Sequence, residues 1–411
     1  MAQRPRILLV LVEGLAETVI DSAVLEHARD SRDQGVADFT VWAFCWSRGM
    51  RRLSQARLAR AQALAGCEIR LLRGLRPGLP GSLAFNALRL RLALLWRGRR
   101  PDLIHARDAY ATALCAAARP RGTPLIWDCR GDGVAESAER LAARAWLPGW
   151  MRRLKQRAVE RIHARAARAC DGLIFVSREL AETCRHAVGD KPSAIIPCAA
   201  SEGLFYFDPE LRARTRAALG YARDQRVFVY CGSLAPYQCF GDVVGQFAAI
   251  AAQDERARLL VVTPDVETAR RETSGLDRAA VRIVSAALGE VNPYLNAADA
   301  AFMTRRTTAA NAVASPVKFA EYSLAGLPVI MNEAVRDAWR QAGEIGNRAA
   351  LDGARLQVSP TFQREEVARR ARLLLGKQRF AHLYGALVRM TLGRRTASPR
   401  EAQAARPVGL Q

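Results

Sequence analysis

Lys318 and Glu321 stand three residues apart at the start of an expected helix, where one offers a positive charge and the other a carboxylate. Ser315 is the expected N-cap, and Pro316 suits the first helical position, where a missing backbone N–H costs nothing. A lysine in the first turn adds to the positive end of the helix dipole, which is unfavourable unless an anion binds there. We therefore expect a phosphate near Lys318 and a hydroxyl group near Glu321.

The same spacing also fits an ordinary surface helix with a Lys–Glu ion pair, which is worth about 0.2–0.5 kcal/mol. The spacing alone leaves both interpretations open. Lysine is scarce in this chain, since only positions 155, 191, 318 and 377 among its 62 basic residues are lysines. That scarcity draws attention to Lys318.

Composition limits the class of protein. The 411 residues, 50% of them hydrophobic, are enough for two domains with buried cores. The formal net charge of +22 favours anionic partners such as sugar nucleotides, phospholipid surfaces or nucleic acid. The nine cysteines include no Cys-x-x-Cys pair, so we expect reduced thiols and no metal. The apolar run Ile7–Val12 is too short for the core of a signal peptide, and we expect a cytoplasmic protein.

Short apolar segments alternate with longer helical patterns along the chain, as in doubly wound α/β domains with parallel sheets. The strands expected in the first half are Ile7–Val12, Phe39–Cys45, Glu68–Leu72, Leu103–His105, Pro124–Asp128, Gly172–Val176 and Ala194–Pro197. Those expected in the second half are Val227–Cys231, Leu259–Thr263, Val281–Ser285, Ala300–Met303, Pro328–Met331 and Leu356–Val358.

Two polar segments lie at the carboxyl ends of expected strands in the first half, which is where open parallel sheets bind their ligands. One contains His105, Arg107 and Asp108; the other contains Asp128 and Arg130, with Glu136 just beyond. A histidine satisfied at a strand end is an equal alternative for His105. A salt bridge to Asp128, Asp132 or Glu136 is an alternative for Arg130.

In the second half, Gly232 and Ser233 form an expected turn after a strand, and the N–H groups of such a turn can bind phosphate. Arg305 follows another expected strand and can add positive charge.

The pattern Ser315-Pro-x-Lys318-x-x-Glu321-Tyr322-x-x-x-Gly326-x-Pro-Val-Ile resembles the donor-site signature of the GT-B glycosyltransferases, particularly glycosyltransferase family 4. The resemblance implies that the loop and helix start hold a nucleotide diphosphate and that the carboxylate of Glu321 binds the ribose hydroxyls. It also implies two Rossmann-like domains of doubly wound parallel sheet facing a central cleft. Residues 1–200 would form the acceptor-side domain and 201–375 the nucleotide-sugar domain, with a helix at 376–393 crossing back and a flexible tail at 394–411.

The resemblance further implies a glycosyltransferase that moves a sugar from a nucleotide sugar to a glycan or lipid-linked acceptor, in the synthesis of a surface polysaccharide or glycoconjugate. We expect retention of configuration and no metal or other cofactor. The expected catalytic residues are Lys318, His105 and Asp108. The expected donor-binding residues are Gly232, Ser233, Arg305, Ser315, Lys318, Glu321 and Tyr322. The expected acceptor-side residues are Arg107, Asp128, Arg130 and Glu136.

The sequence departs from the family pattern at two places. Val313 stands eight residues before Glu321, where the first glutamate of the family's Glu-x7-Glu element would contact the donor sugar. The turn at Gly232 is not followed by the family's arginine and Lys-Gly pair, so Lys318 and either Arg305 or Arg306 are the expected substitutes.

Two segments mix apolar or aromatic residues with arginines, as surfaces that dock on anionic membranes do. They are Phe85–Arg100 and Trp146–Met151. Ordinary packing against a sheet is the alternative for both. A protein peripheral to the inner face of the cell membrane is therefore one interpretation of the localisation.

Three other functions remain open on sequence grounds. The first is an epimerase of GT-B fold that acts on a nucleotide sugar without any acceptor. The second is a non-catalytic partner protein, because of Val313 and of Gln238 in the glycine-turn region. The third is a basic nucleic-acid-binding protein, but the arginines are dispersed and are not interleaved with aromatic residues, so we expect no nucleic acid partner.

Overall fold

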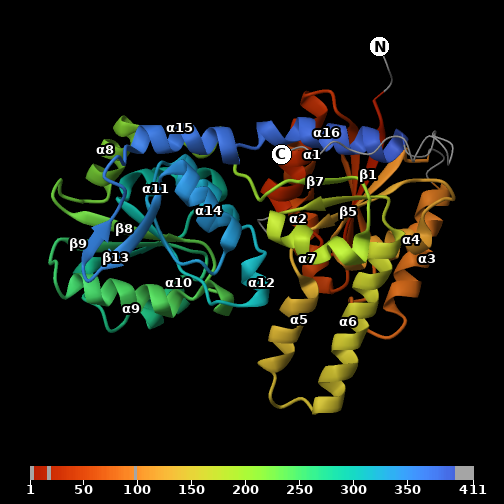
Figure 1. Ribbon diagram of the computed structural model, residues 1–411, viewed down its shortest axis with the longest axis horizontal. Helices are drawn as coiled ribbons and strands as arrows, with labels where there is room; N and C mark the ends of the chain where they lie inside the picture. Colours follow the sequence, from red (N-terminus) through yellow and green to blue (C-terminus); the bar gives the residue numbers. More distant parts are fainter. Residues whose placement is uncertain (1–3, 16–19, 97–99, 394–411) are drawn as a thin grey trace. The chain divides into compact units, whose positions relative to one another are not determined.

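The computed structural model describes residues 4–15, 20–96 and 100–393. The chain divides into two compact units (Figure 1). Unit 1 comprises the chain up to Ile196 together with the segment from Phe380, and unit 2 is Pro197–Arg379. Each unit is built on a seven-stranded sheet of the described chain that is largely parallel and interleaved with helices. The expected fold class, two doubly wound α/β domains, is confirmed. The tail expected from residue 394 lies outside the described residues.

The sheet of unit 1 has the strand order β3-β2-β1-β4-β5-β6-β7, with every pair parallel. Strand order reverses between β1 and β4, and ligands of such sheets bind at this reversal, beyond the carboxyl ends of the strands. The strands are β1 (Arg6–Leu11), β2 (Asp38–Cys45), β3 (Glu68–Arg73), β4 (Leu103–Arg107), β5 (Leu125–Cys129), β6 (Gly172–Phe175) and β7 (Ser193–Ile195).

Several helices of unit 1 begin at side chains that accept from their first free N–H groups. Ser47 and Ser177 each accept from the N–H three residues on, at 3.1 and 3.0 Å, and Asp132 accepts from the next two free N–H groups at 3.0 Å. The helices are α1 (Glu26–Asp33), α2 (Arg48–Ala65), α3 (Ser82–Trp96), α4 (Asp108–Ala118), α5 (Gly133–Ala142), α6 (Gly149–Ala169), α7 (Arg178–Val188) and α16 (Gln378–Gly393), with a π-helical turn, η1 (Asp21–Leu25), before α1.

Unit 2 has the strand order β10-β9-β8-β11-β12-β13-β14, and its order reverses between β8 and β11. All pairs are parallel except the last, β13 with β14, which is a short antiparallel ribbon at the edge. The strands are β8 (Arg226–Cys231), β9 (Ala257–Val262), β10 (Val281–Val284), β11 (Ala300–Met303), β12 (Val329–Met331), β13 (Arg348–Asp352) and β14 (Arg355–Gln357).

The helices of unit 2 cover both faces of its sheet and enclose two apolar clusters. One of these clusters contains Phe228 and Phe302 on neighbouring strands, whose rings stack with centroids 5.8 Å apart. The helices are α8 (Pro209–Ala218), α9 (Phe240–Ala251), α10 (Val266–Glu272), α11 (Val291–Ala297), α12 (Ala309–Ala312), α13 (Val317–Leu324), α14 (Arg336–Ile345) and α15 (Arg364–Leu375), with 3₁₀ turns η2 (Pro236–Gln238), η3 (Arg278–Ala280) and η4 (Leu288–Glu290).

Among the described residues, none of the helices combines the length and apolar content needed to cross a lipid bilayer.

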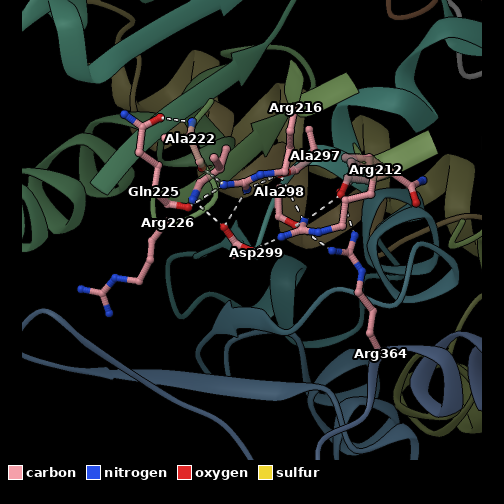
Figure 2. A network of polar contacts seen from close by, with 12 residues as sticks. Arg212, Arg216, Ala222, Gln225, Arg226, Ala297, Ala298, Asp299 and Arg364 are labelled. Atoms are coloured by element: carbon pink, nitrogen blue, oxygen red, sulfur yellow. Dashed lines mark hydrogen bonds and ion pairs between the residues drawn. The ribbon is translucent and has the colours of Figure 1, made fainter. Parts of the chain in front are cut away.

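Asp299, just before β11, ties helix α8 to the sheet of unit 2 (Figure 2). Arg212 donates to one carboxylate oxygen at 2.5 Å and Arg216 to the other at 3.2 Å. The second oxygen also accepts from the backbone N–H of Val227 at the start of β8, at 2.7 Å. One carboxylate thus joins a helix and two strands, which fixes the sheet end opposite the turn at Gly232.

Arg216 holds more than its carboxylate partner. Its guanidinium also donates to the backbone carbonyls of Ala297, Ala222 and Gln225, at 3.0, 2.7 and 2.7 Å. Its side chain is buried, so these carbonyls have little access to water. Loss of the guanidinium would leave them and Asp299 without their partner.

We predict that Arg216→Ala lowers the free energy of unfolding of unit 2 by about 3 kcal/mol, because a partly buried carboxylate and three carbonyls lose their donor. Urea unfolding of the full chain measures this loss. Arg214→Ala is the matched control, since Arg214 lies on the same helix, is exposed and pairs only loosely with Glu210, at 3.9 Å. The control should change stability by less than about 0.5 kcal/mol. Equal losses in the two variants would contradict the assigned role of Arg216.

Candidate active site

The Lys318 cluster lies where the strand order of unit 2 reverses and consists of Lys318, Arg305, Gly232, Gln238 and Tyr230. Gly232 follows β8, Arg305 follows β11, and Lys318 lies in the first turn of α13. The structure therefore brings together three residues that the sequence predicted as donor-binding and that lie 73 and 13 residues apart along the chain.

The ammonium group of Lys318 is nearly buried, with 7% of the residue exposed. It donates to the Oε1 atom of Gln238 at 3.0 Å and lies 4.4 Å from the centre of the Tyr230 ring. It forms no ion pair with any carboxylate of the described residues. Burial, together with the nearby charge of Arg305, lowers the pKa of Lys318 to about 7.

Arg305 adds a second buried cation to the cluster, with 5% of the residue exposed. Its guanidinium lies 5.9 Å from the centre of the Tyr237 ring, and burial lowers its pKa as well. As for Lys318, no ion pair joins it to a carboxylate of the described chain. Two buried cations side by side repel each other, and an anion placed between them would remove that repulsion.

Gly232 has a different role from the one that the sequence suggested. Its N–H was expected to bind phosphate, but it donates to the carbonyl of Val262 at 2.9 Å and extends the β8–β9 ladder. Its φ of +126° favours glycine, and a Cβ atom here would lie 2.9 Å from the Nζ atom of Lys318. Glycine is therefore required because Lys318 occupies the space of a side chain. Neighbouring Ser233 is half-buried, and its carbonyl accepts from the hydroxyl of Tyr230 at 2.7 Å.

The start of α13 also differs from the expectation. Pro316 is the N-cap residue, and the hydroxyl of Ser315 does not cap the helix. Ser315 instead accepts from the backbone N–H of Cys198 at 3.0 Å. The helix start thus keeps free N–H groups without a capping side chain, close to Lys318. Gly326 ends the helix with φ +68°, as expected.

Glu321 and Tyr322 are both buried one turn beyond Lys318 in α13. The hydroxyl of Tyr322 accepts from the backbone N–H of Cys231 at 2.8 Å and donates to the carbonyl of the same residue at 3.3 Å. Tyr322 is fully buried, so its hydroxyl holds the end of β8 in place beneath the cluster. Val313, at the position of the missing glutamate, is also buried.

The Asp128 cluster lies at the corresponding reversal in unit 1 and consists of Asp128, His105, Arg107, Arg130 and Glu13. His105 and Asp128 lie within β4 and β5, as the sequence indicated, and Arg107 also lies within β4 because that strand extends two residues further than expected. The carboxylate of Asp128 lies 3.6 Å from His105 Nε2, 3.7 Å from Arg107 Nη1 and 3.5 Å from Arg130 Nη1. The alternative that Arg130 pairs with Asp128 is thus realised.

These separations are ion-pair distances, longer than good hydrogen bonds. The Oδ1 atom of Asp128, the Nε2 atom of His105 and the Nη1 atom of Arg107 are buried and have no hydrogen-bond partner in the described chain. Burial acts to raise the pKa of Asp128, but Arg130, His105 and Arg107 outweigh it and hold that pKa well below its usual range. Unsatisfied buried groups of both charges suit a polar ligand or water molecules between them.

Glu13 and Asp108 complete the charge pattern around the Asp128 cluster. Glu13, two residues beyond the end of β1, accepts from Arg107 Nε at 2.7 Å and was missed by the sequence analysis. Asp108 begins α4 with φ +70°, and one of its oxygens accepts from the N–H of Ala111 at 3.0 Å. Burial and the nearby charge of Glu13 raise the pKa of the Asp108 carboxyl to about 7. A carboxyl with that pKa can exchange a proton at neutral pH.

The structure adds one residue to the predicted Asp128 cluster, Tyr384, and places another predicted residue, Glu136, in a different ion pair. Tyr384, from α16, was not predicted, yet its hydroxyl lies 3.0 Å from His105 Nδ1 and leaves Nε2 to face Asp128. Glu136 was predicted, but it pairs with Arg140 at 3.4 Å, and about half of its side chain is exposed. Its carboxylate lies close to Gly131, where a Cβ atom would be 2.7 Å away.

Comparison with known proteins places these clusters in context. Residues 24–201 match the family model described as Glycosyltransferase Family 4. Among solved structures, HepE from Anabaena in complex with UDP and glucose is 15% identical, with a TM-score of 0.59 over 98% of this chain and 100% of that one. WaaG, a glycosyltransferase involved in lipopolysaccharide biosynthesis, is 14% identical, with a TM-score of 0.58 over 98% and 100%.

A putative UDP-N-acetylglucosamine 2-epimerase from Listeria monocytogenes is 11% identical, with a TM-score of 0.52 over 99% of each chain. A comparison with curated proteins gave no match.

Likeness at such low identities reports the fold, which is the GT-B fold of the two glycosyltransferases above. The family match adds sequence evidence over most of the first part of unit 1. The chain therefore has the fold of these glycosyltransferases, and residues 24–201 within it match the model of Glycosyltransferase Family 4.

Proposed function

We propose that the protein transfers a sugar from a nucleoside-diphosphate sugar to a glycan or lipid-linked acceptor in the synthesis of a surface polysaccharide or glycoconjugate. The observation that carries the donor side of this proposal is the pair of buried cations, Lys318 and Arg305, which form no ion pair with a carboxylate of the described chain. A diphosphate matches that charge. HepE, which has the same fold, was solved in complex with UDP and glucose, and this supports the same class of donor here.

The chemical difficulty of the reaction is the departure of a nucleoside diphosphate while positive charge develops on the sugar. Fixed cations close to the leaving oxygens stabilise that departure, because they are already oriented before the reaction begins. In our proposal Lys318 and Arg305 supply this charge together with the uncapped N–H groups of α13. Glu321 accepts from the ribose hydroxyls, and the reaction needs no metal.

The Asp128 cluster is the proposed binding site for the acceptor. Three of its buried atoms, one each on Asp128, His105 and Arg107, have no hydrogen-bond partner in the described chain and offer both an acceptor and donors to hydroxyl groups of a sugar. We propose that transfer retains configuration and occurs on one face of the sugar, with the departing phosphate taking the acceptor's proton. The anomeric configuration of the product, determined by NMR, decides this point, since an inverted product excludes it.

An epimerase of the same fold is the second candidate, supported by the structural likeness to the Listeria protein. Such an enzyme would convert a nucleotide sugar without any acceptor. Glycosyl transfer requires one, so incubation of the protein with donor alone separates the two functions.

We predict that Lys318→Ala lowers the rate of transfer by about 10²–10³-fold, because a preorganised cation at the leaving group is lost.

We also predict that Lys318 takes up a proton when UDP binds. Lys318 has a pKa of about 7 in the free protein, so it is largely neutral at pH 8, and a bound diphosphate would raise that pKa. UDP binding at pH 8 should therefore take up nearly one proton, and its affinity should fall as the pH rises above 7.

Calorimetry in buffers of different ionisation enthalpy measures that uptake, which should vanish in Lys318→Ala. Asp128→Asn is the matched control from the other cluster. It should impair transfer while leaving UDP affinity and proton uptake unchanged. Wild-type turnover by Lys318→Ala would refute the assignment.

We also propose that unit 1 docks on an anionic membrane surface that carries the acceptor. Helices α5 and α6 pack side by side and project from the rest of unit 1, with their connecting turn at the far end (Figure 1). Trp146 and Trp150 lie at this turn and are 77% and 60% exposed. Arg144 and Arg153 beside them are also exposed, so the tip offers both aromatic rings and positive charge.

The outer face of α3 supports the same proposal. Phe85, Leu88, Leu92 and Leu95 recur at helical spacing on one face and are all exposed, as are neighbouring arginines. Helix α4 packs between α3 and α6, so the three helices belong to one side of the unit. Residues 97–99 of this predicted segment lie outside the described residues.

We predict that the wild-type protein co-sediments with vesicles containing phosphatidylglycerol and not with vesicles of phosphatidylcholine alone. The double change Trp146→Ser and Trp150→Ser should weaken binding about tenfold or more, because two large aromatic side chains no longer enter the interface. Leu373→Ser is the control, since Leu373 is 60% exposed on unit 2. Binding that does not depend on anionic lipid, or that survives the tryptophan changes, would rule the docking surface out.

A further inference from the structure

A cavity of about 460 Å³ lies in unit 2, away from the Lys318 cluster. Its walls come from the turn before β8, the start of β9, and η3 with the start of β10. These are the amino ends of parallel strands, whereas Gly232 and Arg305 follow carboxyl ends. The cavity is therefore at the opposite end of the sheet from the proposed donor site.

Three arginines line the cavity, and no aspartate or glutamate does. Arg258 donates to the backbone carbonyls of Glu255 and Ala257, at 2.7 and 2.8 Å, and forms no ion pair. The side chains of Arg278 and Arg282 make no hydrogen bond or ion pair with any other described residue. Three positive charges thus converge on one hollow without a counter-charge in the described chain.

The back of the cavity carries polar groups that also lack partners. The hydroxyl of Tyr221 is buried and has no hydrogen-bond partner among the described residues. Burial raises the pKa of Tyr221, so the hydroxyl keeps its proton and can donate it in a hydrogen bond. The side chain of Gln225 accepts from the N–H of Ala222 at 3.1 Å, which leaves its amide hydrogens available.

The wall that carries these groups is held rigidly. Arg216 donates to the carbonyls of Ala222 and Gln225 from below the turn, and Figure 2 shows these bonds converging on its guanidinium. The same guanidinium lies 6.0 Å from the centre of the Tyr221 ring. A turn fixed in this way presents its donors without a cost of reordering when a ligand binds.

We propose that this cavity is a second anion site, which binds a phosphate-bearing ligand through Arg258, Arg278, Arg282 and the hydroxyl of Tyr221. Guanidinium groups bind phosphate oxygens in pairs, and a phosphate can accept from several donors at once. The ligand is a free phosphorylated compound or the headgroup of a phospholipid, which share this chemistry. The site lies far from the reacting atoms, so its role is binding and not catalysis.

Inorganic pyrophosphate is the probe for the test, with binding measured by calorimetry on the full chain. The double change Arg278→Gln and Arg282→Gln should raise the dissociation constant of this site more than tenfold, because two charge-assisted contacts are lost. The control Arg214→Gln and Arg223→Gln removes the same charge from exposed positions of unit 2 that do not line the cavity. It should change the constant less than twofold.

Lys318→Ala separates this site from the proposed donor site, since binding at the cavity should persist in that variant. Equal weakening in the Arg278/Arg282 variant and in its control, or pyrophosphate binding that depends on Lys318 alone, would overturn the proposal.

Vesicles containing phosphatidic acid then show whether the ligand is a phospholipid headgroup or a free phosphorylated compound. If they bind with the same dependence on Arg278 and Arg282, the ligand is a headgroup; if only pyrophosphate binds, it is a free compound. Neither result depends on whether the protein transfers sugar.

Discussion

Buried positive charge that forms no ion pair with a carboxylate of the described residues is the constraint on which the Lys318 cluster depends. Lys318 and Arg305 are almost enclosed, and burial lowers the pKa of both. A chain gains nothing in stability from such an arrangement, because each charge loses water and repels the other. The residues around them follow from this constraint. Gly232 lacks a side chain where the ammonium group lies, and the ring of Tyr230 faces it.

Both clusters sit at the reversal of strand order in their own sheet, which explains how distant residues come together. In unit 1, Glu13 after β1 meets Arg107 of β4, 94 residues later. In unit 2, the turn after β8 meets the start of α13 and the residue that follows β11. The topology of a doubly wound sheet leaves a crevice only at this point, so polar side chains there are not covered by a crossing helix.

Much of the fold could be predicted from the sequence because its strands are short apolar runs and its helices keep a regular pattern. Strand β11 was predicted with its observed bounds, and strand β8 with only its first residue missed. Strand β13, which lies between β12 and the antiparallel edge strand β14, was missed, since Arg348–Asp352 contains a single large apolar residue and is only partly buried. Local signals suffice where the core dictates residue type, and they weaken at an exposed edge.

The sites were harder to predict than the fold, and particular residues show why. Lys318 was found because a cation at a helix start is unusual in itself. Nothing local marks Tyr384 as the partner of His105, which lies 279 residues earlier. The hydroxyl of Ser315 could have capped α13, but it accepts a hydrogen bond from the backbone N–H of Cys198, which is distant in the sequence. The N–H of Gly232 likewise donates to a carbonyl of the neighbouring strand β9.

The contact of Tyr384 with His105 has a consequence for how the chain is made. Helix α16 belongs to unit 1, yet it is encoded after the whole of unit 2. A ribosome therefore releases the first seven strands long before the helix that packs beside His27, Phe39 and His105. Until then an apolar and imidazole-bearing surface stays uncovered. The growing chain must tolerate that exposure throughout synthesis of unit 2, and the Asp128 cluster acquires its final geometry only when α16 has been made.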